Sequence, residues 1–240
     1  MLHLRFICRQ LGASRQQAMI FILCVALSLL TLTSLGGFSS SVRSSTLRDA
    51  RQLHAADITI HSHSPFSEPL LRAVSGYEQQ GLLQGAQVHE FYSMAANQEQ
   101  EKSILAQLKV VAPGYPFYGR VELASGREFA GVLTPGSIVV EQATLDRLQA
   151  RVGGRLQVGA ATLTIADVVT AEPDRPVSFF SFGPRIFVAA ADLASLDLIR
   201  KGSRIQYHYL LKVQDPGQVD QLADALAKVA AEPQERVRTF

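Results

Sequence analysis

The chain has 240 residues, 47% of them hydrophobic, which is enough to bury a core and excludes a disordered protein. Its 23 basic and 21 acidic residues almost balance, so no strong positive field favours nucleic acid as a partner. Cys8 and Cys24 are the only cysteines, so the rest of the sequence has neither a disulfide nor a thiolate metal site.

An uncharged apolar segment extends from Ala18 to Phe38. As a helix its 21 residues would reach about 31 Å at ~1.5 Å per residue, which matches the hydrocarbon core of a bilayer. A buried core helix would keep a polar stripe, and this segment has none. A cleaved signal peptide has a shorter apolar region, of about 7 to 15 residues, and a small-residue cleavage site. We therefore expect a retained transmembrane helix.

The charges around this segment predict its orientation. Arg5, Arg9 and Arg15 precede the segment, and no other charged residue occurs before Arg43. Positive residues stay on the cytoplasmic side of a membrane helix. The N-terminus is therefore expected in the cytoplasm, and the residues after Phe38 in the periplasm of a bacterium, at its inner membrane.

A stalk and a first group of elements follow. Residues 39–57 begin with serines and continue with a helical pattern, which is typical of a stalk. The sequence then predicts a strand at 58–63, a helix at 67–83, strands at 87–95 and 103–111, and a turn-rich stretch at 113–119.

A second group of elements begins near Gly136. The pattern predicts a strand at 137–141, a helix at 142–151, two strands joined by a tight turn at Gly159 and Ala160, strands within 184–190 and 203–213, and an amphipathic helix at 219–229. Strands and helices thus occur without regular alternation, and the predicted fold class is α+β.

The histidines do not make a convincing metal site. His61 and His63 lie two residues apart on a predicted strand, so both rings would project from one face. No third ligand is apparent, and solvent-facing histidines are the preferred interpretation. His54, His89 and His208 are isolated in the sequence and are expected at the surface or half-buried. We predict no metal and no cofactor.

Catalytic motifs are also absent from the sequence. It contains no G-x-S-x-G nucleophile elbow and no G-x-x-x-x-G-K-[ST] phosphate-binding loop. Glu99 and Glu101 fall in a polar stretch that is expected to be exposed, so paired carboxylates have no visible site. We predict no catalytic residues and conclude that the chain is not an enzyme.

Three phenylalanines form the one candidate contact site. Phe179, Phe180 and Phe182 lie between Pro176 and Pro184, whose positions predict a loop. Two interpretations stay open. The rings fold back as a plug on the core of the domain, or they form an exposed tip that contacts lipid, a hydrophobic cargo or a partner protein.

Three segments carry a resemblance to a known family. They are RDARQLHAADITIHS at 48–62, VVAPGYPFYGRVEL at 110–123 and GPRIFVAAADLASLDLIRKGSRIQYHYLL at 183–211. In order and spacing they resemble the FtsX/MacB-type ABC transporter permeases, within them the YbbP-like subfamily. The chain is similar to an N-terminal part of such a permease, because it lacks the further membrane helices of the family.

The resemblance implies an organisation for the chain. Residues 1–42 would be the cytoplasmic N-terminus and membrane helix, 43–135 a porter-like α+β part, 136–213 an inserted, mainly β subdomain, and 214–240 the returning helix and strand of the porter-like part. The whole outer part would be a MacB-like periplasmic domain.

The resemblance also implies a function and partners. The chain would be part of a permease whose periplasmic domain handles lipid or hydrophobic cargo, or transmits ATP-driven motion across the inner membrane. Expected partners are a cytoplasmic ABC ATPase, a periplasmic lysophospholipase-type esterase, membrane lipid and a second copy in a homodimer. The alternative is a single-pass periplasmic sensor or scaffold that binds a partner protein.

Overall fold

The computed structural model describes residues 19–20, 22–30, 55–173, 183–200, 203–231 and 233–239. Contacts divide the chain into two compact units, residues 1–49 and 50–240. In the first unit, residues 19–20 and 22–30 are helical. None of the helices in these described ranges is both long and apolar enough to cross a bilayer. Much of the expected span at 18–38, and nearly all of the stalk, lies outside the described residues, so the membrane helix stays a prediction.

The second unit is built on a mixed sheet. Its order is β10-β1-β9-β2-β3-β8-β5-β7-β4, with β6 paired to β2 and β7. The described strands are β1 (Ile58–Ser62), β2 (Leu83–Asn97), β3 (Lys102–Val111), β4 (Glu122–Leu123), β5 (Ser137–Glu141), β6 (Arg155–Val158), β7 (Ala161–Ala171), β8 (Arg185–Ala189), β9 (Gln206–Val213) and β10 (Arg236–Thr239).

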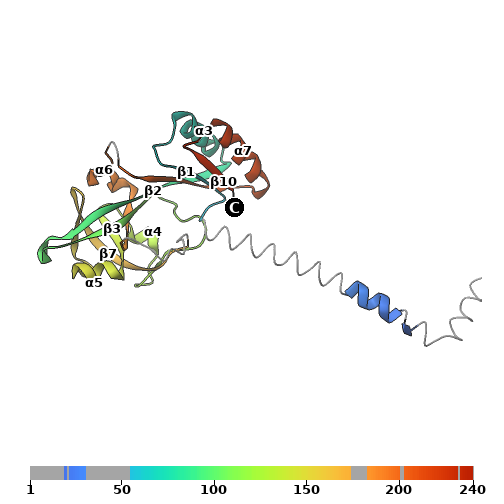
Figure 1. Cartoon of the computed structure of the whole chain (residues 1–240), viewed down its shortest axis with the longest axis horizontal. Coiled ribbons are helices and arrows are strands. Elements are labelled where there is room, and N and C mark those ends of the chain that lie inside the picture. Colours follow the sequence, from blue (N-terminus) through green and yellow to red (C-terminus); the bar gives the residue numbers. More distant parts are fainter. Residues whose placement is uncertain are drawn as a thin grey trace, which may run out of the picture. The chain divides into compact units, whose positions relative to one another are not determined.

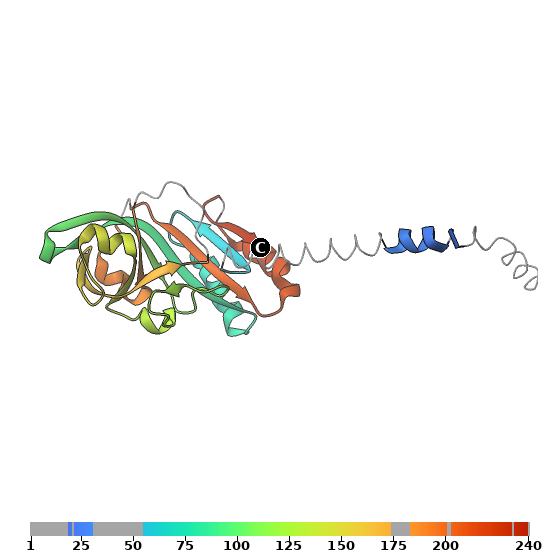
Figure 2. The ribbon, with the colours of Figure 1, turned by 90° about the horizontal axis from the view of Figure 1, so that it is seen from below.

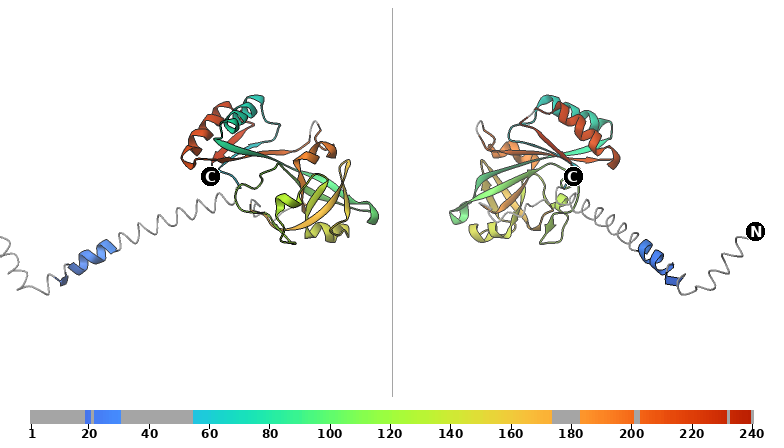
Figure 3. Two further views of the ribbon diagram at one scale, coloured as in Figure 1. Left: turned by 180° about the vertical axis from the view of Figure 1, so that it is seen from behind. Right: turned by 45° about the vertical axis from the view of Figure 1, so that its right-hand side comes forward.

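Two helices cover one face of the sheet at its β10 end. Helices α3 (Glu68–Gln79) and α7 (Val219–Val229) lie side by side there (Figures 1 and 3). The four strands β10, β1, β9 and β2 are antiparallel neighbours, so β1-α3-β2 and β9-α7-β10 form a split β-α-β arrangement. The core between helices and strands includes Leu70, Val74, Leu222, Leu226 and Ile60.

A glycine ends helix α3 earlier than the sequence pattern indicates. Gly81 has a φ of +71°, and the N–H groups of Gly81 and Leu82 donate to the carbonyls of Glu78 and Tyr77 at 2.9 and 3.0 Å. This pattern is a Schellman cap, in which glycine takes the left-handed conformation at low cost. The residues from Leu83 onward are thereby released to begin β2.

The other end of the sheet closes into a ring. In the described part of the chain β2, β3, β8, β5, β7 and β6 pair in this order, and β6 pairs again with β2 through Val158 and Ala95. Strand β2 runs from this ring to the helix-covered part (Figure 2). The interior of the ring is apolar and includes Leu108, Ile138, Leu156, Ile165 and Ile186, each fully buried.

Short helices and turns connect these strands. They are η1 (Gln98–Gln100), α4 (Phe129–Val132), α5 (Gln142–Leu148), η2 (Ala190–Asp192), α6 (Leu193–Leu196) and η3 (Pro216–Gln218). The predicted turn at Gly159 is confirmed between β6 and β7. Gly159 has a φ of +59°, and a Cβ there would overlap the carbonyl oxygen of Leu196. The α+β class is confirmed, whereas the division at Gly136 stays a prediction.

Candidate functional site

A pocket surrounds the turn-rich stretch after β3. It has a volume of about 690 Å³ and is lined by residues 114–116, 119–123, 126–130 and Thr170. We call it the 114–130 pocket. Its lining includes buried Tyr115, Val121, Leu123 and Phe129. A concave site with apolar walls is the usual form of a small-molecule site.

Aromatic rings form the base of this pocket. The Phe129 ring lies edge-on to the Phe187 ring of β8, with centroids 5.3 Å apart, and edge-on to the Tyr115 ring, at 6.3 Å. Phe187 is fully buried. The base is therefore firmly packed against the sheet.

A carboxylate fixes one wall of the pocket. Asp167 of β7 accepts hydrogen bonds from the Ser125 hydroxyl, from the Arg127 guanidinium at 3.1 Å and from the N–H of Val168 at 2.8 Å. Burial alone would raise the pKa of Asp167, but these hydrogen bonds outweigh it and hold the pKa below its usual value. Asp167 is thus charged and anchors the turn at Gly126.

The loop between two lining residues of the pocket, Pro116 and Gly119, contacts the segment that leads into β1. The N–H of Phe117 donates to the Ala55 carbonyl at 3.2 Å, and the Tyr118 hydroxyl donates to Asp57 Oδ2 at 2.8 Å. The same Asp57 oxygen accepts the N–H of Val213, at the end of β9, at 2.9 Å. One carboxylate therefore joins the pocket wall, the start of β1 and the end of β9.

A buried charge network lies beneath the base. Lys109 of β3 is fully buried, and its ammonium lies 3.5 Å from Glu90 and 3.8 Å from Glu172. It also lies 4.7 Å from the centre of the Tyr115 ring. Arg185 contacts both carboxylates, at 3.8 Å for Glu90 and closely for Glu172. Two cations and two carboxylates thus compensate one another away from water.

The same network holds both ends of a connection. Glu172 follows β7 and Arg185 begins β8, so their ion pair joins the residues that flank 174–182. Beside it, Gln107 accepts a hydrogen bond from Arg185 at 3.2 Å and donates one to Glu90 at 3.1 Å. A Cβ at Gly183 would overlap the Leu105 carbonyl, so the chain passes against β3 there.

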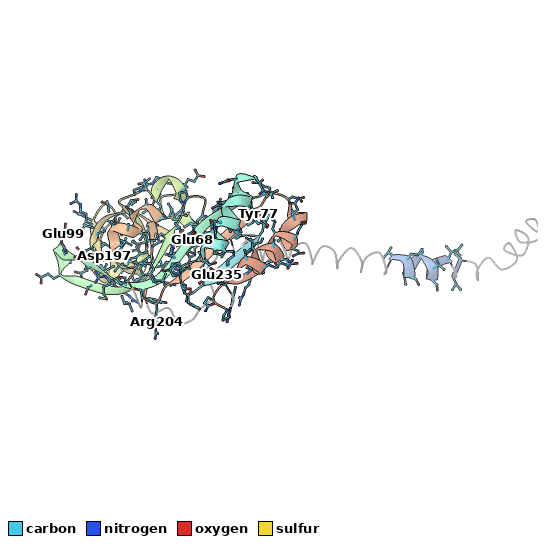
Figure 4. The ribbon with its side chains drawn as sticks, turned by 90° about the horizontal axis from the view of Figure 1, so that it is seen from above. Glu68, Tyr77, Glu99, Asp197, Arg204 and Glu235 are labelled. Carbon is cyan, nitrogen blue, oxygen red and sulfur yellow. The ribbon has the colours of Figure 1, made fainter. Side chains whose placement is uncertain are left out.

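The predicted contact residues Phe179, Phe180 and Phe182 lie outside the described residues, and they stay a prediction. The structure places Glu99 and Glu101 at the exposed turn between β2 and β3, as expected. Figure 4 shows Glu99 at the end of the second unit away from Tyr77 of α3.

The histidines are arranged differently from the expectation. His208 is not isolated, because its Nδ1 lies 2.7 Å from Nδ1 of His61 on the neighbouring strand. His89 is buried against Tyr207, and its pKa is lowered by burial and by the charge of nearby His208. In the described ranges no group of three or more His, Cys, Asp or Glu side chains could hold a metal ion.

The family described as MacB-like periplasmic core domain matches residues 18–229. The chain belongs to this family. Within the curated proteins, the uncharacterized ABC transporter permease YbbP of Escherichia coli (strain K12) is 26% identical over 189 residues, which are 78% of this chain and 22% of that protein. The chain thus spans about a fifth of the length of this relative.

Solved structures agree on the fold. The periplasmic region of MacB from Actinobacillus actinomycetemcomitans has a TM-score of 0.52 at 14% identity, over 79% of this chain and 91% of that one. The extracellular domain of the noncanonic ABC-type transporter YknZ from Gram-positive bacteria has a TM-score of 0.51 at 12% identity, over 76% and 100%. The chain therefore has the fold of its family, the MacB-like periplasmic core domain, which is not a catalytic family.

Proposed function

We propose that the chain is the N-terminal part of a permease subunit of the inner membrane, whose periplasmic domain carries ATP-driven motion to a site for lipid or another hydrophobic cargo. Residues 18–38 are its first membrane helix, and 136–213 are an inserted subdomain. The ring of strands includes β5, β6, β7 and β8 of this segment, which supports the insertion, whereas β9 at the end of the segment pairs with β1 and β2.

One observation carries this proposal. The chain that leads from the membrane helix joins the 114–130 pocket through Ala55 and Asp57, which bind Phe117 and Tyr118. Because Asp57 also binds the N–H of Val213, a displacement of this chain acts on the sheet and on the pocket wall together. A rigid, packed connection of this kind transmits motion between discrete arrangements.

The partners follow from the same proposal. A cytoplasmic ABC ATPase drives the motion through other parts of the permease. A lysophospholipase-type esterase in the periplasm takes or supplies the cargo, and two copies of the permease act together as a homodimer. Phe179, Phe180 and Phe182 form a hydrophobic tip that contacts lipid, cargo or the esterase.

A tryptophan probe tests the lipid contact. The chain contains no tryptophan, so Phe117→Trp creates a single fluorescent reporter beside the 114–130 pocket, between its lining residues Pro116 and Gly119. The full chain is reconstituted into liposomes with and without brominated phospholipid, which quenches tryptophan by contact. Val152→Trp, at a half-exposed residue before β6, is the matched control.

We expect brominated lipid to quench the probe at 117 clearly more than the probe at 152. Equal quenching at the two positions would show that the pocket has no special access to lipid and would contradict the proposed cargo class. Failure of the full chain to remain with the liposomes would contradict the membrane helix itself.

A further inference from the structure

A second pocket lies on the face of the sheet that α3 and α7 leave uncovered, over β1, β9 and β10. Its volume is about 470 Å³, and its lining contains His61, His63, His208, Arg236 and Arg238. Serine hydroxyls and glutamine amides complete the polar lining, and no aspartate or glutamate lines it. We call it the His-Arg pocket. Every ionisable group in its wall is therefore basic.

The strand register gathers these side chains. His61 pairs with Arg236 on one side and with His208 on the other, so the three residues form a row across β10, β1 and β9. Arg238 is two residues from Arg236, on the same face of its strand. Residues from three separate parts of the sequence thus form one basic surface.

Acidic residues near the His-Arg pocket are engaged elsewhere. Glu235 precedes Arg236, but its carboxylate accepts hydrogen bonds from the N–H and hydroxyl of Ser67, at 2.5 and 3.0 Å, and from the N–H of Ala231 at 2.6 Å. Figure 4 shows it beside Glu68, the first residue of α3. On β2, Glu90 pairs with Gln206 in the register and is held by Lys109.

The histidine pair adds a proton-dependent element. With the Nδ1 atoms 2.7 Å apart, one ring donates a hydrogen bond through its Nδ1–H and the other accepts it. A proton added at the accepting Nδ1 would place two N–H groups against each other. An anion in the pocket would accept hydrogen bonds from such groups and offset the added charge. The titratable and charged groups around the pair are His63, Arg236 and Arg238, with His89 and Glu90 on β2 and Lys212 farther along β9.

We propose that the His-Arg pocket binds a phosphate group, of a free phosphate or of an anionic phospholipid headgroup. Arginine guanidinium groups bind phosphate oxygens in pairs, and protonated imidazoles and hydroxyls supply further donors. Binding takes up protons, because phosphate stabilises the charged histidines. This site is distinct from the 114–130 pocket and does not depend on the cargo proposed for it.

Titration calorimetry on the full chain tests the site. In the first arm, inorganic phosphate is titrated into the chain in neutral detergent. In the second arm, binding of the chain to phosphatidylcholine liposomes is measured with and without phosphatidylglycerol in the liposomes. The test variant is Arg236→Gln with Arg238→Gln. The matched control is Arg151→Gln with Arg155→Gln, which removes two exposed arginines beside β6.

We expect saturable binding in at least one arm, tighter at about pH 6 than at about pH 8 because histidine titrates in this range. The test variant should bind about tenfold more weakly or worse, since each charge-assisted hydrogen bond is a strong one, and the control should bind like the wild type. Binding of inorganic phosphate assigns the site to free phosphate, and binding that requires phosphatidylglycerol assigns it to a headgroup.

Three results would overturn the proposal: no saturable binding in either arm, an equal loss in the control variant, or weaker binding at the lower pH. If the test variant melts early, His63→Gln replaces it, because His63 is exposed. That variant should weaken phosphate binding at about pH 6 or at about pH 8, because it removes an imidazole from the lining of the pocket. Unchanged binding at both values would count against the pocket.

Discussion

Lys109 shows how a single side chain can bear on both the core and the pocket above it. Lys109→Met leaves the carboxylates of Glu90 and Glu172 with Arg185 as their one cation in the described network. Breaking a buried ion pair on one side costs about 3 to 5 kcal/mol. We expect a loss of that size in the free energy of unfolding, measured by urea titration of the full chain.

A second substitution separates charge from packing. Glu90→Gln added to Lys109→Met restores neutrality, so it should recover part of the loss. Lys102→Met, at the half-exposed start of β3, is the control and should change stability by about 0.5 kcal/mol or less. A Lys109→Met variant as stable as the wild type would refute the network.

Asp167 gives the stability of the domain a defined pH dependence. The pKa of Asp167 is lower in the folded state than in the unfolded chain, where it is about 3.9. The charged carboxylate therefore adds to the free energy of unfolding above that value, and this contribution is lost as the pH falls through the folded pKa. Asp167→Asn should therefore destabilise the chain at neutral pH, and the difference from the wild type should shrink below about pH 4.

Urea titrations at a series of pH values check this prediction, with Asp224→Asn as the control at an exposed position of α7. A difference between Asp167→Asn and the wild type that is the same at every pH would show that shape, not charge, holds the turn at Gly126.

At this scale the sequence predicted least. Lys109 and Arg185 were not identified, although a lysine between Leu108 and Val110 in an apolar strand is the pattern of a buried, paired charge. His61 and His208 are 147 residues apart, and only the pairing of β1 with β9 brings their rings together. Local spacing contains no information on such contacts.

Elements were predicted better, because periodicity and turn residues act locally. Helix α7 was expected at its observed limits, and β3 and β5 differ from expectation by one residue at most. Boundaries failed where a left-handed residue ends a helix, as Gln149 does after α5 with a φ of +49°. The short α4 and α6 were missed, since four residues are too few to show a period.

Substitutions in the connection between β7 and β8 test whether its phenylalanines form an exposed hydrophobic tip. If Phe179 and Phe180 form a hydrophobic tip, replacing both by alanine should leave the melting temperature of the full chain almost unchanged and should lower its binding to partner or liposome. If the rings are part of the core, each substitution should cost about 3 to 5 kcal/mol. A large drop in melting temperature would therefore end the tip proposal.

The whole molecule is organised around the end of the sheet at which β1 begins. Ile58 pairs with Thr239, so the start of β1 and the end of β10 lie at the same end of the sheet. The 114–130 pocket contacts this end through Phe117 and Ala55. This shared end is where the described part of the second unit begins, and the proposed transmission of motion starts there.

The closing of the ring could not be predicted from the sequence. Strand β6 has four residues, and its pairing with Ala95 and Ala96 depends on where the β2–β3 hairpin reaches in space. The order of the family's three segments nevertheless predicted the fold, because a family match summarises many such distant contacts at once.

The orientation of the chain across the membrane tests the central claim most directly. Alkaline phosphatase, which is active only in the periplasm, is fused after Phe240 in one strain and after Gln10 in another. Because Arg5, Arg9 and Arg15 precede the uncharged run, the fusion after Phe240 should be active and the fusion after Gln10 silent. An active fusion after Gln10 with a silent one after Phe240 would contradict a periplasmic domain held by an N-terminal membrane helix.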